Sequence, residues 1–395
     1  MNFLIINSVA LNGGDEALLL ATIMGIKNKY PNAQIIVLAK DYKICNKYIQ
    51  YVNFLPDWEY SISRLLILQT IRKVLEKMGI PLYHRLSLLF TSKTEKRVVD
   101  LYKNADVIIS SPGGYIHDIY GYHWRLKAFE MALYFKKNLF FLGHSIGPFH
   151  EDNKKYHLRL KQVFEKSQKI ILRENISQKH LIEIGYKSDN VVVTIDIAFS
   201  LFKYYKHLFV TKNTYNRKLA LTFREWLDKQ TTENIIQKAI HLSNHLISNG
   251  YHLTFISTCQ GVLEYKDDSK IAIKIIHGLD PENRKYCDVI DKRLHPDELI
   301  KAYSEFDAYI GMRLHGAILS MLGGTPAFNI GYEDKTKGIF DILGLSNYQI
   351  WYSERISDWI KSVDNFLNNL ERIHADLKNK IENASDLALS SFSYI

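Results

Sequence analysis

The sequence predicts an α/β protein of two similar units, each built on a parallel sheet. Short apolar, β-branched runs alternate with helical patterns, and this alternation favours parallel strands joined by right-handed crossovers. The alternation stops in a polar, aromatic stretch at 201–217 and then begins again. A chain of 395 residues also suits about two domains, at roughly 150 residues each. We therefore expect units at 1–200 and 201–365, and a C-terminal helix at 366–395 that can pack back on the first unit.

The first unit is expected to contain strands at short apolar runs and helices where apolar residues recur with the helical period. The expected strands are 3–6, 35–38, 107–110, 140–143, 170–173 and 191–194. The expected helices are 16–30, 124–137, 154–166 and 177–184.

The second unit repeats the pattern. Its expected strands are 219–223, 253–257, 288–290, 308–311 and 327–330. Its expected helices are 232–248, 267–278, 296–304, 315–322 and 337–343, followed by a long helical stretch at 357–387. Ligands of open parallel sheets bind beyond the carboxyl ends of the strands. The pattern therefore favours a two-lobed enzyme with its active site in the cleft.

Composition favours a cytoplasmic globular protein. Hydrophobic residues make up 47% and charged residues 24% of the chain, which is ordinary for a soluble fold. No run reaches the roughly 18 apolar residues of a membrane span, and the first residues lack the basic leader of a secretory signal. The cysteines Cys45, Cys259 and Cys287 are few and widely spaced. They suit a reducing compartment and offer no metal-ligand spacing, so we expect no metal and no cofactor.

The net charge of +9 favours an anionic partner. The excess is concentrated at 61–97, a stretch that contains eight cationic and two anionic residues. Residues 61–90 fit either an amphipathic helix half buried on its unit or a helix that docks on anionic lipid. The second alternative would place the protein on the inner face of the cell membrane. No nucleic-acid motif is visible, so we expect no nucleic-acid partner.

Two glycine-containing loops follow expected strands. Asn12-Gly13-Gly14-Asp15-Glu16 opens a helix, where glycine allows close backbone approach and the helix end offers N–H donors. The same residues equally fit a plain capped turn. The loop at 110–115, which contains Gly113 and Gly114, is a strand-end glycine loop of the kind that lines α/β clefts. His117 follows this loop, and a lone histidine is more often structural than catalytic.

Two arginines, Arg173 and Arg224, stand at the ends of expected strands. A guanidinium group binds two oxygens of a carboxylate or phosphate at once. Each arginine is followed by a glutamate, so a structural Arg–Glu pair is the alternative.

The stretch from Arg313 to Lys335 combines a fixed cation, a titratable imidazole at His315 and a flexible ammonium group. Arg313 and His315 stand at a strand-to-helix transition, and Lys335 is expected in the loop after the following strand. Histidine transfers protons near neutral pH. The set therefore suits a small, doubly anionic substrate that must also gain or lose a proton.

Taken in their order along residues 4–345, the motifs of this chain resemble those of the polysaccharide pyruvyl transferase family. The matching residues are 12–16, 111–114, 145–148, Arg173 with Ser177, Asp196 with Phe199, 224–226, 267–268, 313–316, Gly324 with Pro326, and Tyr332 with Lys335. The resemblance implies two Rossmann-like lobes with a central cleft, similar to GT-B glycosyltransferases. It also implies transfer of a pyruvyl group from phosphoenolpyruvate to two sugar hydroxyls, which makes a cyclic ketal.

The resemblance also implies roles for individual residues. The residues that match donor-binding and catalytic positions are Arg173, His315 and Lys335. The further expected contacts to phosphoenolpyruvate are Arg224, Arg313 and Leu314. The expected contacts to the sugar acceptor are Asn12, Gly14, Asp15, Glu16, Gly113 and Gly114. The sequence leaves open whether the acceptor is lipid-linked, nucleotide-linked or a free glycan, and it leaves the oligomeric state open.

Two other functions remain alternatives. The first is a GT-B type glycosyltransferase that uses a nucleotide sugar, because the fold would be the same and only the donor would differ. The second is a basic binding protein without enzymatic activity, for which a charge of +9 over 395 residues is modest.

Overall fold

The structure is a computed structural model that describes residues 1–58, 70–71, 74–75, 78, 92–119, 121–212 and 214–395. Its contacts divide the chain into two compact units. Unit 1 comprises Met1–Ala10, Thr22–Thr194 and Ser391–Ile395, and unit 2 comprises Leu11–Ala21 and Ile195–Ser390. The segment 61–90, for which the sequence left two alternatives, lies almost wholly outside the described residues.

Unit 1 contains a parallel sheet with strand order β3-β2-β1-β4-β6-β7-β8, and β5 also pairs with β6. The bounds are β1 (Asn2–Ser8), β2 (Gln34–Ala39), β3 (Asn53–Pro56), β4 (Val107–Ser110), β5 (Gly113–Ile116), β6 (Asn138–Ile146), β7 (Lys169–Leu172) and β8 (Val191–Val193). β4 and most of β1 and β6 are buried along their length, as expected for parallel strands covered on both faces. The parallel α/β unit predicted from the sequence is confirmed.

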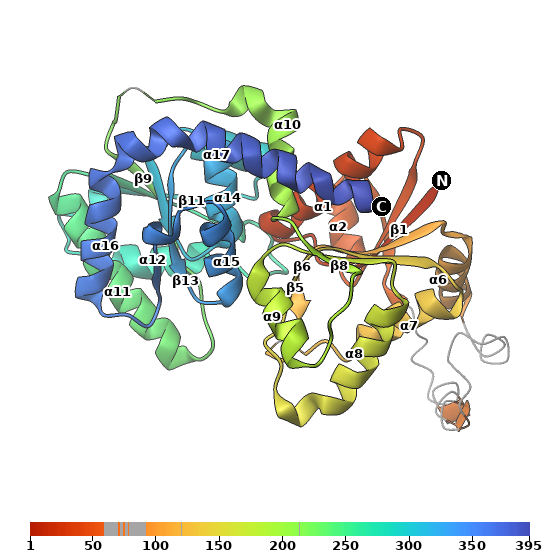
Figure 1. The fold of residues 1–395 in the computed structure, drawn as a ribbon. Coiled ribbons are helices and arrows are strands. Elements are labelled where there is room, and N and C mark those ends of the chain that lie inside the picture. Colours follow the sequence, from red (N-terminus) through yellow and green to blue (C-terminus); the bar gives the residue numbers. More distant parts are fainter. Residues whose placement is uncertain (59–69, 72–73, 76–77, 79–91, 120, 213) are drawn as a thin grey trace. The chain divides into compact units, whose positions relative to one another are not determined.

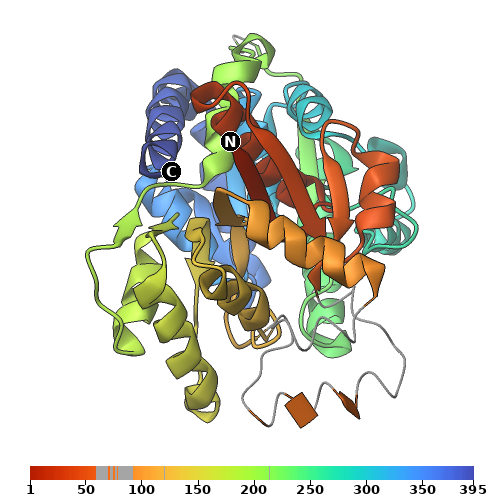
Figure 2. The same ribbon diagram turned by 90° about the vertical axis from the view of Figure 1, so that its right-hand side faces the viewer.

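Helices cover the sheet of unit 1. They are the later part of α1 (Gly13–Lys29), α2 (Tyr42–Tyr48), α6 (Lys93–Asn104), α7 (Leu126–Tyr134), α8 (Lys154–Lys166) and α9 (Asn175–Glu183). α6 begins with a capping box, in which Ser92 accepts from the backbone of Glu95 and Glu95 accepts from the backbone of Ser92. It packs on β1 (Figure 2). Its buried Val98, Val99 and Tyr102 join the core of this unit.

Unit 2 contains a second parallel sheet, with strand order β11-β10-β9-β12-β13-β14. The bounds are β9 (Lys218–Thr222), β10 (His252–Ile256), β11 (Cys287–Ile290), β12 (Ala308–Gly311), β13 (Ala327–Gly331) and β14 (Gln349–Trp351). Counted within the unit, the order is 3-2-1-4-5-6, which is that of Rossmann-like sheets. The order reverses between β9 and β12, so the expected ligand crevice lies at the carboxyl ends of these two strands.

Helices cover both faces of this sheet as well. Their bounds are α11 (Lys229–Ser248), α12 (Ser269–Gly278), α13 (Pro296–Tyr303), α14 (Leu314–Leu322), α15 (Asp334–Ile342) and α16 (Ile356–Asn368). α11 contacts α12 and α16 over one shared core (Figure 1). α14 is apolar and almost wholly buried, as expected for a helix enclosed by protein. It packs on β12 and β13 and contacts α13.

The helical stretch expected at 357–387 is two helices, α16 and α17 (Leu370–Ser390), which meet at Asn369. α17 contacts α14 and the short helix η2 (Ile197–Leu201) within unit 2. The last five residues belong to unit 1. There the carbonyl oxygens of Phe392 and Ser393 accept hydrogen bonds from Lys29, at 3.1 and 3.3 Å. No helix within the described ranges is long and apolar enough to cross a membrane.

Within the described residues, three strands, and two helices of at least seven residues, were not expected. They are β3, β5, β14, α2 and α6. The expectation of a glycine loop at Gly113 and Gly114 is wrong, because both residues begin strand β5 and Gly113 pairs in register with His144 on β6. Gly113 has a φ of +146°, a region that L-residues with a side chain rarely adopt.

Candidate active site

Three of the predicted cationic positions lie at the carboxyl edge of the unit 2 sheet. Arg224 follows β9, Arg313 follows β12, and Lys335 lies in the first turn of the helix after β13. The strands β9, β12 and β13 are neighbours, and Arg224 and Arg313 follow the two strands between which the strand order reverses. Ligands of doubly wound sheets bind at this place. The position of Arg173 is different, because it belongs to unit 1.

His315 is the second residue of α14 and is largely enclosed, with a side chain that is 14% exposed. Its Nε2 lies 3.4 Å from Oδ2 of Asp196, which is fully buried. Among the described residues, Nε2 of His315 makes no hydrogen bond, so the carboxylate is a close neighbour and not a hydrogen-bond partner. The other oxygen of Asp196 accepts a hydrogen bond of 3.0 Å from the backbone of Ala198. A fixed carboxylate beside an imidazole restricts the orientation of the ring.

Gly14 packs against the other side of the His315 imidazole. A Cβ at position 14 would lie 2.6 Å from Cβ and Nδ1 of His315. Contacts below about 3.0 Å are essentially never tolerated, so a side chain here would displace the imidazole. One of the two alternatives that the sequence left open was that glycine in this loop allows close backbone approach to a ligand. The structure instead places the catalytic candidate itself against the Gly14 backbone.

The N–H donors at the start of α1 are largely engaged with protein oxygens. Gly13 donates to the carbonyl of Thr258 at 2.7 Å, and Glu16 donates to the carbonyl of Asn12 at 2.8 Å. Gly14 donates to Oδ1 of Asn12 at 2.9 Å. Asn12 thus serves as a cap, which agrees with the capped-turn alternative. Asp15 in the same turn is half-buried.

Glu16 is fully buried and both of its carboxylate oxygens have partners in unit 2. One oxygen pairs with Nη2 of Arg293, and the other lies 2.7 Å from Nδ1 of His295. Both oxygens of Glu16, an expected contact to the sugar acceptor, are therefore engaged within the protein. The group that is exposed at this point is the His295 ring, whose side chain is 40% exposed.

Arg313 was expected to contact phosphoenolpyruvate, and in the structure it pairs with Asp268. Its Nε and Nη2 donate to the two oxygens of Asp268, at 2.7 and 2.8 Å. Asp268 in addition accepts a hydrogen bond of 2.6 Å from Ser257. Both members of the pair are nearly buried. The bidentate pair ties the residue before α14 to the segment after β10, so it fixes the backbone from which His315 projects.

Arg224 lies close to two aromatic rings. Its Nη1 donates to the hydroxyl of Tyr332 at 2.7 Å. Its guanidinium carbon lies 4.9 Å from the Tyr332 ring centroid and 5.4 Å from that of Trp226. These contacts combine cation–π attraction with a directed hydrogen bond. They hold the guanidinium group in place at the carboxyl edge of the sheet.

Lys335 lies near Tyr332, one of the two aromatic residues that contact Arg224. The sequence placed it in a loop, but it lies in the first turn of α15, and its Nζ is 6.0 Å from the Tyr332 ring centroid. Its ammonium group pairs with Glu333, which is the N-cap residue of the helix. Leu314 is the first residue of α14 and its side chain is buried. A contact between Leu314 and a ligand would therefore involve its backbone.

The predicted site residues of unit 1 occupy a different sheet. Arg173 directly follows β7 and is 1% exposed. Its Nε donates to the hydroxyl of Ser145 at 2.8 Å. The following Glu174 caps α9 by accepting from the backbone of Ser177 at 2.9 Å, so it does not form the Arg–Glu pair that was the alternative. Gly113 and Gly114 lie at the start of β5.

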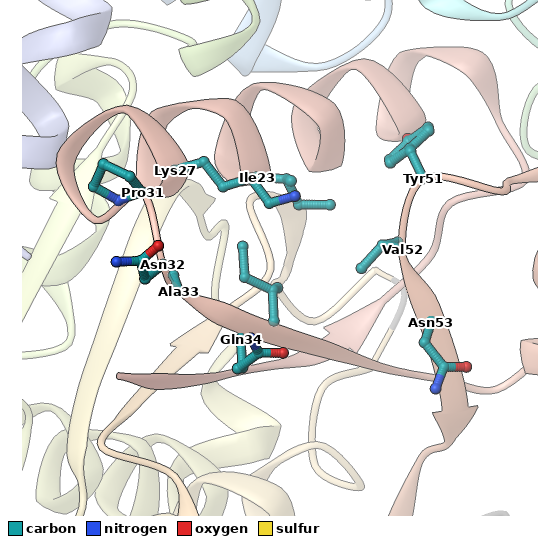
Figure 3. Close-up of a pocket in the computed structure, with 10 residues that line it drawn as sticks. Ile23, Lys27, Pro31, Asn32, Ala33, Gln34, Tyr51, Val52 and Asn53 are labelled. Atoms are coloured by element: carbon teal, nitrogen blue, oxygen red, sulfur yellow. The ribbon is translucent and has the colours of Figure 1, made fainter.

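A hollow of about 450 Å³ in unit 1 is not part of this site (Figure 3). It is bordered by the end of α1 and the amino ends of β2 and β3, opposite the edge where ligands of parallel sheets bind. Among the described residues that line it, Lys27 carries the charge. Within the described parts of the chain, no group of three or more His, Cys, Asp or Glu side chains could hold a metal ion. Burial raises the pKa of the Cys259 thiol to about 11, which keeps it protonated and unreactive.

The protein has two Rossmann-like sheets. At its carboxyl edge the second sheet carries cations and a histidine that lies beside a buried carboxylate. These features are typical of two-unit α/β enzymes. Residues 12–334 match the polysaccharide pyruvyl transferase family. The chain belongs to this family. The amylovoran biosynthesis protein AmsJ of Erwinia amylovora is 25% identical over 406 residues, with 95% of this chain and 94% of the relative covered.

Solved structures share the fold. The UDP-N-acetylglucosamine 2-epimerase of Neisseria meningitidis, bound to UDP-N-acetylglucosamine, has a TM-score of 0.59 at 12% identity, with 99% of both chains covered. A glycosyltransferase of Rickettsia africae has a TM-score of 0.56 at 12% identity, with 98% of this chain and 96% of that chain covered. At this identity the likeness shows the fold alone. It confirms the predicted GT-B-like architecture of Rossmann-like units.

Proposed function

We propose that this protein transfers the pyruvyl group of phosphoenolpyruvate onto two hydroxyls of a sugar. The products are a cyclic ketal and phosphate, and the sugar belongs to a precursor of a surface polysaccharide or exopolysaccharide. Membership of the polysaccharide pyruvyl transferase family supports this reaction class. The observation that carries the proposal is His315, which lies between the buried Asp196 carboxylate and the Gly14 backbone.

The chemistry requires cations and at least one proton carrier. Phosphoenolpyruvate bears a carboxylate and a phosphate. Protonation of its methylene carbon makes C2 electrophilic, one sugar hydroxyl attacks C2, and phosphate leaves with the C–O bond electrons. The second hydroxyl then attacks C2 and closes the ketal. His315 is the proposed proton-transfer residue of this sequence, because its imidazole is fixed and backed by a carboxylate.

The remaining cations divide between substrate binding and positioning. The proposed contacts to the donor anions are Lys335 and Arg224, whose guanidinium group lies close to the rings of Tyr332 and Trp226. Arg313 is proposed to act through Asp268 by fixing the start of α14. The backbone of Leu314, the next residue, is the proposed donor contact at that position. The role of Arg173 in donor binding and catalysis stays a prediction from the resemblance.

The acceptor side of the proposal rests mainly on the resemblance. Contacts at Asn12, Asp15, Gly113 and Gly114 stay predictions, and so does a lipid-linked acceptor. The same is true of a cytoplasmic location with docking of residues 61–90 on an anionic membrane surface.

Direct assay of the purified protein tests the proposal. The protein is mixed with phosphoenolpyruvate and a panel of synthetic and lipid-linked glycosides, while phosphate release and ketal mass are followed. We expect phosphate and ketal in equal amounts, and a loss of about 100-fold or more in the His315→Ala variant. The matched control is His245→Gln, because His245 on α11 pairs with Asp364 on α16, away from the site. Full activity of His315→Ala would contradict the assigned role.

Thermal stability separates this proposal from a glycosyltransferase that uses a nucleotide sugar. A ligand that binds the folded protein raises its melting temperature. We expect phosphoenolpyruvate to raise it. Stabilisation by a nucleoside diphosphate without any by phosphoenolpyruvate would instead favour the glycosyltransferase.

A further inference from the structure

A second imidazole beside a fully buried carboxylate lies in unit 2, at His295. Nδ1 of His295 is 2.7 Å from Oε1 of Glu16, which is 0% exposed. The other oxygen of Glu16 pairs with Arg293. The carboxylate is therefore held on both sides, and it fixes the orientation of the His295 ring while the ring remains 40% exposed.

Other histidine–carboxylate pairs in this unit are of a different kind. His245 lies 2.9 Å from Asp364 and His252 lies 2.8 Å from Asp288, but these carboxylates are 39% and 69% exposed. Solvent screens such surface pairs and makes them weak. Glu16 and Asp196 are instead both fully buried. The His295–Glu16 pair thus shares its distinctive feature with the His315–Asp196 pair.

The two buried-carboxylate pairs border the same short loop. Gly14 packs on His315, while Glu16, two residues later, holds His295. A Cβ at Gly13 would meet Leu299 on α13 at 2.9 Å. His295 directly precedes α13 and His315 lies in the first turn of α14, and these two helices are in contact. Residues 14 and 16 project from different sides of the first turn of α1, so the two imidazoles flank this turn.

The proposed reaction must move two protons. Each of the two sugar hydroxyls loses one proton when its oxygen bonds to C2. One proton is gained by the methylene carbon, which becomes the methyl group of the ketal, and the other leaves with phosphate. The two hydroxyl oxygens occupy different positions around C2. Two separately placed proton carriers therefore fit the reaction better than one.

We infer that His295, positioned by Glu16, is a second acid–base residue of this enzyme and exchanges a proton with the acceptor or the departing phosphate while His315 serves the other transfer. This inference rests on the proposed function. In it, His295 is a catalytic residue, and Glu16 is a positioning residue that does not touch substrate.

The charges around His295 support a proton-donating role near neutral pH. The hydrogen bond to Glu16 raises the pKa of His295, burial opposes this in part, and the Glu16 charge adds to the rise. Arg293 lowers the pKa and Glu298 raises it. The imidazole therefore keeps its proton to higher pH than a free histidine, and a step that needs its acid form fails as pH rises through the raised pKa.

The test measures how kcat for phosphate release depends on pH with the glycoside that the wild-type protein uses. His295→Gln retains a side-chain amide that can donate to Glu16 but carries no titratable proton. We expect kcat to fall about 100-fold or more and its alkaline limb to disappear. Glu16→Gln keeps an acceptor oxygen but removes the charge, so the limb should move to lower pH. His245→Gln should behave as wild type, and stabilisation by phosphoenolpyruvate should persist in His295→Gln, which shows that the variant is folded.

Each other outcome overturns the inference. An unchanged kcat profile in His295→Gln with a raised KM for the glycoside would make His295 a binding residue only. A wild-type kcat in this variant would remove any catalytic role while leaving the proposed function intact. A wild-type protein that neither binds phosphoenolpyruvate nor releases phosphate would overturn the proposed function and this inference together.

Discussion

The backbone of Gly14 lies directly against the imidazole of His315, so that a Cβ at position 14 would be 2.6 Å from Nδ1 of the ring. With Asp196 at Nε2, this contact fixes the ring. It joins residues 301 positions apart in the sequence. The helix start that looks like a ligand loop in the sequence is thus a support for the catalytic candidate.

Gly14→Ala is expected to displace His315 and to lower kcat by about 100-fold, since misplacing a catalytic group by about 1 Å has effects of this size. Kinetics of phosphate release measure the loss. Gly13→Ala is the matched control, because a Cβ there would meet the flexible end of Leu299 at 2.9 Å and the carbonyl oxygen of Thr258 at 3.1 Å but not His315, so its effect on kcat should be much smaller. Equal losses in both variants would show that the turn, rather than the His315 contact, matters.

Removal of one partner from the Arg313–Asp268 pair should destabilise unit 2. Asp268→Ala leaves an uncompensated charge in a nearly buried position, which costs about 3–5 kcal/mol in comparable cases. Urea-induced unfolding, followed by circular dichroism, measures this change in the free energy of unfolding. The double variant Asp268→Leu with Arg313→Met replaces both charges with apolar groups and should recover most of the loss. A stable Asp268→Ala single variant would contradict a structural role for the pair.

Tyr332→Phe should weaken donor binding with little effect on folding. The variant keeps the ring beneath Arg224 but removes the hydroxyl that accepts its hydrogen bond at 2.7 Å. Without this hydrogen bond the guanidinium group is less pre-organised for an anion, so we expect KM for phosphoenolpyruvate to rise about tenfold. Tyr348→Phe is the control, since the Tyr348 ring packs on Phe366. An unchanged KM would show that Arg224 does not bind the donor.

His144 should make unit 1 sensitive to acid. Burial lowers the pKa of His144 to about 3, whereas in the unfolded chain the pKa is about 6.5. Between these values the unfolded state binds more protons, so the free energy of unfolding falls as pH falls. The loss contributed by this residue between about pH 7.5 and about pH 5 is on the order of 2 kcal/mol.

His144→Gln should therefore show a smaller drop of melting temperature between the same two pH values, because glutamine stays neutral. His123→Gln serves as the control, since His123 is exposed and should leave the pH dependence at its wild-type level. An identical pH dependence in His144→Gln and wild type would assign the acid sensitivity to other groups.

Local pattern accounts for most of the observed elements. Buried parallel strands such as β4 and β12 are short apolar runs, and α8 has the amphipathic period that marks a helix. Other elements carry a weaker local signal. β3 contains a proline, β14 is three residues long, and β5 begins with two glycines. These strands form because neighbouring strands supply their hydrogen-bonding partners, which a local window does not contain.

The sequence by itself determined the two parallel α/β units, the cations that follow β9, β12 and β13, and the prominence of His315. Only the tertiary structure decided what these side chains contact. Arg313 pairs with Asp268, 45 positions away, and Glu16 pairs with His295, 279 positions away. Local sequence sets backbone conformation and burial. A buried charged side chain needs a partner of opposite charge, and the fold decides which partner lies close enough to pair with it. For that reason Glu16 supports a histidine where the sequence alone predicted a contact with sugar.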